Sequence, residues 1–124
     1  MSTVPFEVRT LDHVNVTAPE ALESEVVSWY REVLGLEQLD KPSGTRRERG
    51  GWFKAGDREL HISIDPPGPS PQAHFALTVD DYAAALEHLR AAGCHIEPAG
   101  PIPGRQRFFI RDPAGNRLEI IGFD

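Results

Sequence analysis

The chain contains one short pattern twice, and this internal repeat limits its fold more than any other feature. The stretch His13-Val-Asn-Val-Thr17 resembles His74-Phe-Ala-Leu-Thr78, with an offset of 61 residues. Leu60-His61-Ile62 resembles Leu118-Glu119-Ile120, with an offset of 58 residues, and Gly35 and Gly93 share that second offset. The two offsets differ by three residues, because the segment between the first strand and the glycine is three residues shorter in the second copy than in the first. We therefore expect two copies of one module, with three histidines and one glutamate at equivalent positions.

Each copy reads as a β-α-β-β-β module. Alternation of apolar and polar residues predicts strands, and apolar residues at three- and four-residue spacing predict helices. Module one, about 9–65, is expected to have a strand at 11–17, a helix from Pro19 to Gly35, and strands at 36–42, 50–55 and 58–64. Module two, about 73–123, is expected to have strands at 73–79, 95–98, 105–111 and 116–122, and a helix at 81–92 capped by Asp80. Four prolines in 65–72 mark a linker, because proline interrupts both helices and sheets. The pattern predicts an α+β fold in which 1–124 form a single domain of two modules with cupped mixed sheets.

Bulk properties exclude several classes of function. At 124 residues the chain is long enough for one ordinary domain with its own core. A net charge of −6 argues against nucleic acid as a partner, and no apolar run approaches the length of a membrane span. The only cysteine, Cys94, favours a reducing compartment. We expect a cytoplasmic protein that binds neither nucleic acid nor membranes.

One face of each predicted sheet carries the candidate functional residues. Successive side chains of a strand point to opposite faces, so the apolar neighbours of each candidate face the helix. The other face carries His13, His61, His74 and Glu119. If the first and last strands of each module lie together at the centre of a cupped sheet, two facing modules bring these four side chains around one point.

Imidazole nitrogens and a carboxylate oxygen are ligands of borderline divalent metals. We therefore expect one metal ion per site, of which Zn, Ni, Co, Mn and Fe all remain possible. Glu59 is an alternative to His61, since it shares the same face, but only His61 aligns with Glu119 when the glycines at the helix ends are aligned. The other two histidines, His88 and His95, are expected on the surface.

Four longer motifs carry a family resemblance over residues 9–123. They are Leu11-Asp-His-Val-Asn-Val16, Trp29-Tyr-Arg-Glu-Val-Leu-Gly-Leu36, His74-Phe-Ala-Leu-Thr-Val-Asp80 and Phe109-Ile-Arg-Asp-Pro-Ala-Gly-Asn-Arg-Leu-Glu119. With these motifs the chain resembles the vicinal oxygen chelate superfamily, which contains glyoxalase I, fosfomycin-resistance thiol transferases, extradiol dioxygenases and bleomycin-resistance proteins. The resemblance implies a glyoxalase-like fold and metal ligands from the first and last strands of each module, here His13, His61, His74 and Glu119. Bacterial glyoxalase I has a glutamate where this chain has His61.

The expected reaction is proton transfer next to a carbonyl on a small substrate that chelates the metal through two neighbouring oxygens. Such chelation stabilises an enediolate, which is lyase or isomerase chemistry of the glyoxalase type. Either Glu119 or a metal-bound hydroxide is the expected base. Arg47 and Arg107 are candidates to bind an anionic part of the substrate, with Arg46, Arg49 and Arg105 nearby in sequence. The alternatives are a thiol transferase of the fosfomycin-resistance type, an extradiol-type dioxygenase and a metal-free protein that binds a small molecule such as an antibiotic.

We also expect a homodimer, because short strands leave sheet edges open and a stiff proline-rich linker favours an extended chain. Module one of one subunit would then face module two of its partner, as the resemblance also implies. Each site would take His13 and His61 from one subunit and His74 and Glu119 from the other.

Overall fold

A computed structural model of the protein describes residues 5, 9–41, 49–64 and 73–123. The predicted linker, 65–72, lies outside the described residues, as do Arg46 and Arg47. None of the described helices has the length and apolar character that a membrane crossing needs.

The described elements repeat one order twice along the chain. Module one contains β1 (His13–Ala18), a 3-10 turn η1 (Glu20–Leu22), α1 (Glu23–Glu32), β2 (Glu37–Leu39), β3 (Gly51–Ala55) and β4 (Arg58–Ile64). Module two contains β5 (His74–Thr78), α2 (Tyr82–Ala91), β6 (Glu97–Pro98), β7 (Arg105–Arg111) and β8 (Arg117–Phe123). The predicted duplication and the α+β fold of two βαβββ modules are thus confirmed.

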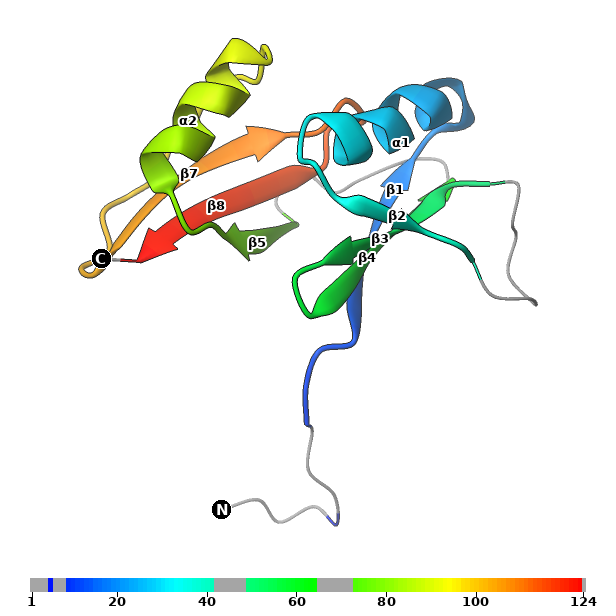
Figure 1. Ribbon diagram of the computed structural model, residues 1–124, viewed down its shortest axis with the longest axis horizontal. Coiled ribbons are helices and arrows are strands. Elements are labelled where there is room, and N and C mark those ends of the chain that lie inside the picture. Colours follow the sequence, from blue (N-terminus) through cyan, green and yellow to red (C-terminus); the bar gives the residue numbers. More distant parts are fainter. Residues whose placement is uncertain (1–4, 6–8, 42–48, 65–72, 124) are drawn as a thin grey trace.

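Each module forms one mixed four-stranded sheet with the same topology. The strand orders are β1-β4-β3-β2 and β5-β8-β7-β6, and in both sheets the first strand pairs in parallel with the last. The candidate-bearing strands are therefore neighbours, as predicted, but β1 and β5 each lie at the edge of a sheet instead of at its centre. In Figure 1, α1 and α2 lie on the same side of the two sheets, which leaves the opposite faces of the sheets without a helix. We call these uncovered faces the ligand faces.

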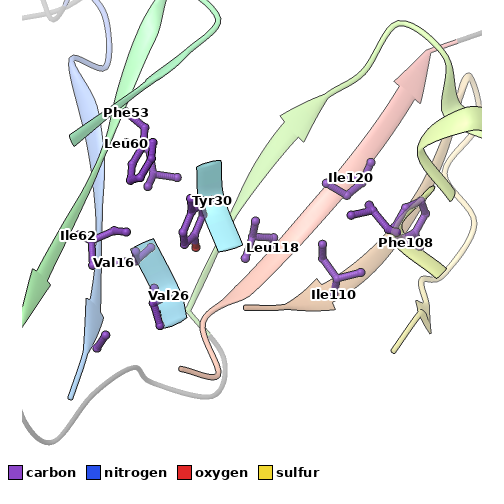
Figure 2. Packing of buried hydrophobic residues seen from close by; sticks show 12 residues of the cluster. Val16, Val26, Tyr30, Phe53, Leu60, Ile62, Phe108, Ile110, Leu118 and Ile120 are labelled. Atoms are coloured by element: carbon purple, nitrogen blue, oxygen red, sulfur yellow. The ribbon is translucent and has the colours of Figure 1, made fainter. Parts of the chain in front are cut away.

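A single apolar core runs through both modules on the helix side. Its buried members come from alternate positions of the strands and from the two helices; they are Val16, Ala18, Val26, Tyr30, Phe53, Leu60, Ile62, Leu89, Phe108, Ile110, Leu118 and Ile120. Figure 2 shows Val26 and Tyr30 of α1 between the strands of module one and Leu118 of β8. The first helix therefore packs against both sheets, and burial of this shared surface holds the modules together.

Polar contacts reinforce the junction between the modules. The Tyr30 hydroxyl donates a hydrogen bond of 2.7 Å to Oδ2 of Asp112, which lies in the turn between β7 and β8. In the same turn, Asn116 Nδ2 donates to the Thr17 carbonyl oxygen at the end of β1, at 2.8 Å. His88 on α2 contacts the Val33 carbonyl oxygen through Nε2, also at 2.8 Å. The relative placement of the two modules is thus fixed by directional contacts as well as by packing.

Several predicted boundaries are corrected. The α-helix of module one begins at Glu23, because Pro19 precedes a 3-10 turn instead of the α-helix itself. The N-cap of α2 is Asp81 and not Asp80, since the Asp81 carboxylate accepts a hydrogen bond from the Ala84 amide. The strands expected at 36–42 and 95–98 shrink to three and two residues. Both are edge strands. For such strands, local alternation predicts that a strand is present but not how long it is.

Candidate functional site

The strand register places the candidate residues at matching positions of the two sheets. In module one, His13 is opposite Glu59 and Asn15 is opposite His61. In module two, His74 is opposite Arg117 and Ala76 is opposite Glu119. Residues that face each other across a ladder project to the same side, so all these side chains lie on the ligand faces. The register makes His61 the structural equivalent of Glu119, in agreement with the alignment of the sequence repeats.

Module one holds its two histidines in a stack of three rings. The His13 and His61 rings lie 4.0 Å apart with an interplanar angle of 20°, and the Trp52 indole stacks on the other face of His61 at 3.8 Å and 5°. The three residues come from neighbouring strands, which brings their rings into one row. His61 is buried, with 7% of its surface exposed, whereas His13 at the end of the stack is accessible. Packing on both faces therefore restricts the orientation of the His61 ring.

Carboxylates orient both of these rings. Asp12 Oδ2 lies 2.9 Å from His13 Nδ1, and this contact lowers the pKa of the Asp12 carboxyl. Glu59 Oε1 lies 2.9 Å from His61 Nε2. A carboxylate on one ring nitrogen is the usual support of a metal-binding histidine, whose other nitrogen then points to the metal. His13 thus offers Nε2 to a metal, and module one offers as its second donor either His61 Nδ1 or the Glu59 carboxylate.

Module two brings its two candidate donors into one pair. His74 Nε2 lies 3.5 Å from Glu119 Oε1. The other carboxylate oxygen, Oε2, lies 3.3 Å from Nη1 of Arg107, whose Nη2 donates to the Gly100 carbonyl oxygen at 2.8 Å. Two donors bound at about 2.1 Å to one tetrahedral zinc ion lie roughly 3.4 Å apart, so the spacing of this pair suits joint coordination. The donor set of module two therefore fits a divalent metal.

The two donor pairs do not merge within one chain. Among the residues that the structure describes, no three His, Cys, Asp or Glu side chains form a group that could hold a metal ion. His88 and His95 are exposed, as predicted, although His88 also contacts the end of the first helix. Arg47 falls in a range that is not described, and Arg107 is found against Glu119. In the described part of one chain the donors therefore form two separate pairs and no four-donor group.

A pocket of about 300 Å³ opens where the two modules meet, next to His13. Its walls come from the start of β1, the turn between β3 and β4, and the edge strand β5. Leu11, Val14, Phe75 and Leu77 contribute apolar surface beside the polar His13. A small molecule with an apolar part can therefore lie beside the first candidate donor.

Three side chains that lie at the site are not among the candidates from the sequence, namely Asp12, Trp52 and Arg117. The alternation within each strand does assign Trp52 and Arg117 to the ligand faces, but it does not say which neighbour lies beside them. The cross-strand register supplies that information, since Trp52 is opposite His61 and Arg117 is opposite His74.

Two similar modules, parallel pairing of the first and last strand of each module, and matched polar pairs on the uncovered faces define a glyoxalase-like fold. The model of the Glyoxalase/Bleomycin resistance protein/Dioxygenase superfamily matches residues 10–120, and the chain belongs to this superfamily.

Solved structures agree with this assignment. A glyoxalase family protein from Bacillus anthracis is 31% identical, with a TM-score of 0.89 over 98% of this chain and 100% of that chain. Lactoylglutathione lyase from Agrobacterium tumefaciens is 25% identical, with a TM-score of 0.71 over 91% of this chain and 92% of that chain. TnmS3, an antibiotic binding protein from Streptomyces sp. CB03234, is 19% identical and shares the fold, with a TM-score of 0.76 over 96% and 99% of the two chains. A comparison with curated protein sequences gave no match. Solved structures of this fold thus include both an enzyme and a binding protein.

Proposed function

We propose that the protein is a metal-dependent enzyme of the glyoxalase type, a lyase or isomerase acting on a small substrate with two neighbouring oxygens. One divalent ion per site, Zn, Ni, Co, Mn or Fe, would be held by His13, His61, His74 and Glu119. The observation that carries this proposal is the matched pairing of donors: His13 with His61 and His74 with Glu119 occupy the same register in two sheets of equal topology. The spacing of 3.5 Å between His74 and Glu119 supports it.

We propose further that each site is shared between two subunits of a homodimer. One chain contributes two donors per module, and the strands that carry His13 and His74 are both edge strands. Edge strands have unpaired backbone groups and suit contact with a second copy. Module one of one subunit would face module two of its partner, which completes the donor set twice per dimer.

When bound, the metal would polarise the two substrate oxygens as a Lewis acid. The side chains around it are suited to binding the substrate and moving one proton. The first oxygen of Glu119, Oε1, faces His74, while Arg107 holds Oε2. We assign Glu119 as the base: its carboxylate would loosen from the metal and take the proton at Oε1 from the carbon next to the carbonyl. Arg107 positions this carboxylate and remains, with Arg47, a candidate to bind an anionic part of the substrate.

Exchange of a carbon-bound hydrogen tests the reaction directly. Protein loaded separately with each of the five metals would be incubated in D₂O with hydroxyacetone or glyceraldehyde, and exchange at the carbon next to the carbonyl followed by proton NMR. We expect exchange that requires metal and that Glu119→Ala abolishes. Metal titration by calorimetry would accompany it, with His13→Ala as a loss-of-binding variant. His95→Ala is the matched control, because His95 is exposed and precedes β6, which is at the opposite edge of the sheet from β5.

A metal-free binding protein is the second candidate. The apolar pocket beside His13 favours it, as do the protein partners that His61 and Glu119 already have. Elemental analysis of protein purified without a histidine tag separates the two functions. If no metal copurifies and none of the five ions binds more tightly to the wild type than to His13→Ala, the enzyme proposal fails and the binding function stands.

We also propose a cytoplasmic location. The only cysteine of the sequence, Cys94, has no second cysteine with which to form an intrachain disulfide. Burial raises the pKa of its thiol, which disfavours the reactive thiolate. Thiol labelling of cell extracts, followed by a non-reducing gel, tests this location. We expect the protein to be reduced and to run as a monomer on that gel.

A further inference from the structure

Arg117 lies on the ligand face of module two, directly beside a proposed metal ligand. It begins β8 and is opposite His74 in the parallel ladder. Its guanidinium lies over the Phe109 ring, with Cζ 3.6 Å from the ring centroid. Stacking on an aromatic face fixes the plane of the guanidinium and leaves the N–H groups at its edge outside the stack. Arg117 is therefore a fixed donor group at the site and not a loosely placed surface charge.

The charge of Arg117 is not neutralised by the side chains around it. Arg111, directly opposite on β7, pairs with Glu97 at 3.4 Å, and Arg107 on the far side of Phe109 pairs with Glu119 at 3.3 Å. No carboxylate among the described residues forms an ion pair with Arg117. The Nε atoms of Arg107 and Arg117 are both buried and, in the described part of the chain, both lack an acceptor. Around Phe109, the three guanidinium groups of Arg107, Arg111 and Arg117 thus face two carboxylates, those of Glu119 and Glu97, which leaves one positive charge in excess.

The repeat gives this charge a counterpart of opposite sign. Arg117 is opposite His74 in module two, and the equivalent residue in module one, opposite His13, is Glu59. Two otherwise similar half-sites therefore differ in charge at one matched position. An anionic substrate would meet attraction at the Arg117 end and repulsion at the Glu59 end, so it would bind in only one orientation.

We propose that Arg117, with Arg107 beside it, binds an oxyanion of the substrate, so that the substrate carries a carboxylate or phosphate group in addition to the oxygens at the metal. This inference rests on the proposed function, because it assigns the substrate class of the same site. A guanidinium whose edge is exposed binds a carboxylate or phosphate through two parallel hydrogen bonds. The anion also offsets part of the positive charge of the two arginines and of the metal.

Anion titrations test the proposal. Inorganic phosphate and acetate would be titrated separately into chloride-buffered protein, both metal-loaded and chelator-treated, with binding followed by two-dimensional NMR of the backbone amides. We expect saturable shifts at residues of β7 and β8 in both forms of the protein. Stronger binding of phosphate would indicate a phosphorylated substrate, and stronger binding of acetate a carboxylic acid. Saturable binding of either anion there supports the proposal.

Three variants make the assignment specific. Arg117→Gln should weaken binding about tenfold or more, as expected for the loss of a charge-assisted hydrogen bond. Arg117→Lys should fall between this variant and the wild type, because lysine keeps the charge but lacks the planar fork. Arg90→Gln, on the exposed side of α2, removes the same charge elsewhere and should bind as the wild type does. Thermal unfolding of each variant checks its fold.

The proposal is overturned if Arg117→Gln binds both anions as well as the wild type, or if the wild type binds neither. Failure of the enzyme proposal shows itself differently, as absence of metal binding in the titration without anions. Arg117 is not one of the proposed metal ligands, so its substitution leaves that measurement intact.

Discussion

The Tyr30 hydroxyl donates a buried hydrogen bond to the Asp112 carboxylate at 2.7 Å, and this contact joins the helix of module one to a turn of module two. The same carboxylate accepts from the backbone amides of Ala114 and Asn116 and from the Asn116 side chain. A buried carboxylate with four donors is well satisfied, so the turn is held in one conformation. The contact matters for the site because β8, which carries Arg117 and Glu119, begins directly after this turn.

Replacing Tyr30 by phenylalanine should lower the free energy of unfolding by about 1–3 kcal/mol, the usual cost of removing one partner from a buried hydrogen bond. Urea denaturation measures it. The matched control is Tyr82→Phe, because no described residue forms a hydrogen bond with the Tyr82 hydroxyl. Equal losses in the two variants would contradict a special role for the contact with Asp112.

The same contact predicts the response to alkaline pH. Burial, and then the charge of Asp112, raise the pKa of Tyr30 well above its ordinary value of 10.0. The unfolded chain therefore releases the Tyr30 proton at a lower pH than the folded protein does. Stability contributed by Tyr30 is complete below pH 10 and falls as pH rises above it, by about 1.4 kcal/mol per pH unit. Unfolding curves should be measured from pH 8 to 11 for the wild type and for Tyr30→Phe. The free energy of unfolding should fall less steeply above pH 10 in Tyr30→Phe, because that variant has no phenol to titrate.

Metal affinity should distinguish His61 from Glu59 as the second donor of module one. We expect His61→Ala to abolish high-affinity binding, whereas Glu59→Gln, which removes only the carboxylate that orients the ring, weakens it roughly 10- to 100-fold. Calorimetric titration with zinc measures both. The opposite order, with Glu59→Gln the more damaging substitution, would make Glu59 the ligand and His61 its support.

Mixing two inactive variants tests whether sites are shared between subunits. His13→Ala and Glu119→Ala chains should each lose metal binding alone. After subunit exchange, a heterodimer would contain one site with both defects and one intact site, so metal binding returns to about half of its sites. Because sites built within one chain would stay defective in any mixture, absence of recovery after confirmed exchange argues against a shared site.

Gly122 should tolerate no side chain, because a Cβ there would lie 2.7 Å from the Cβ of Tyr82 at the start of α2. Backbone-linked atoms of a helix cannot easily move aside, so Gly122→Ala should cost about 1–3 kcal/mol through overpacking. Thermal unfolding measures the loss. Gly100→Ala is the control, since its nearest neighbour would be the flexible end of Arg107 at 4.0 Å. Similar melting temperatures for Gly122→Ala and the wild type would contradict this packing of α2 on β8.

The repeat and the alternation within strands determine the modular fold and the face on which each candidate lies. His13, His61, His74 and Glu119 can be assigned to the face opposite the helices from the sequence alone, because the side-chain period of a strand is a local property. The equivalence of His61 with Glu119 also follows from aligning the two copies, and the register agrees with it.

Lateral neighbours, in contrast, are decided only when strands pair and modules pack. No local pattern places Trp52 on His61, Arg107 against Glu119, or Tyr30 on Asp112, since each pair joins residues from different elements. The N-cap of the second helix at Asp81 likewise depended on which of two adjacent aspartates reached the Ala84 amide. Tertiary packing also leaves the two donor pairs apart within one chain. The period of a strand tells where a side chain points, whereas only the folded chain determines what it meets there, because those contacts join residues that are distant in the sequence.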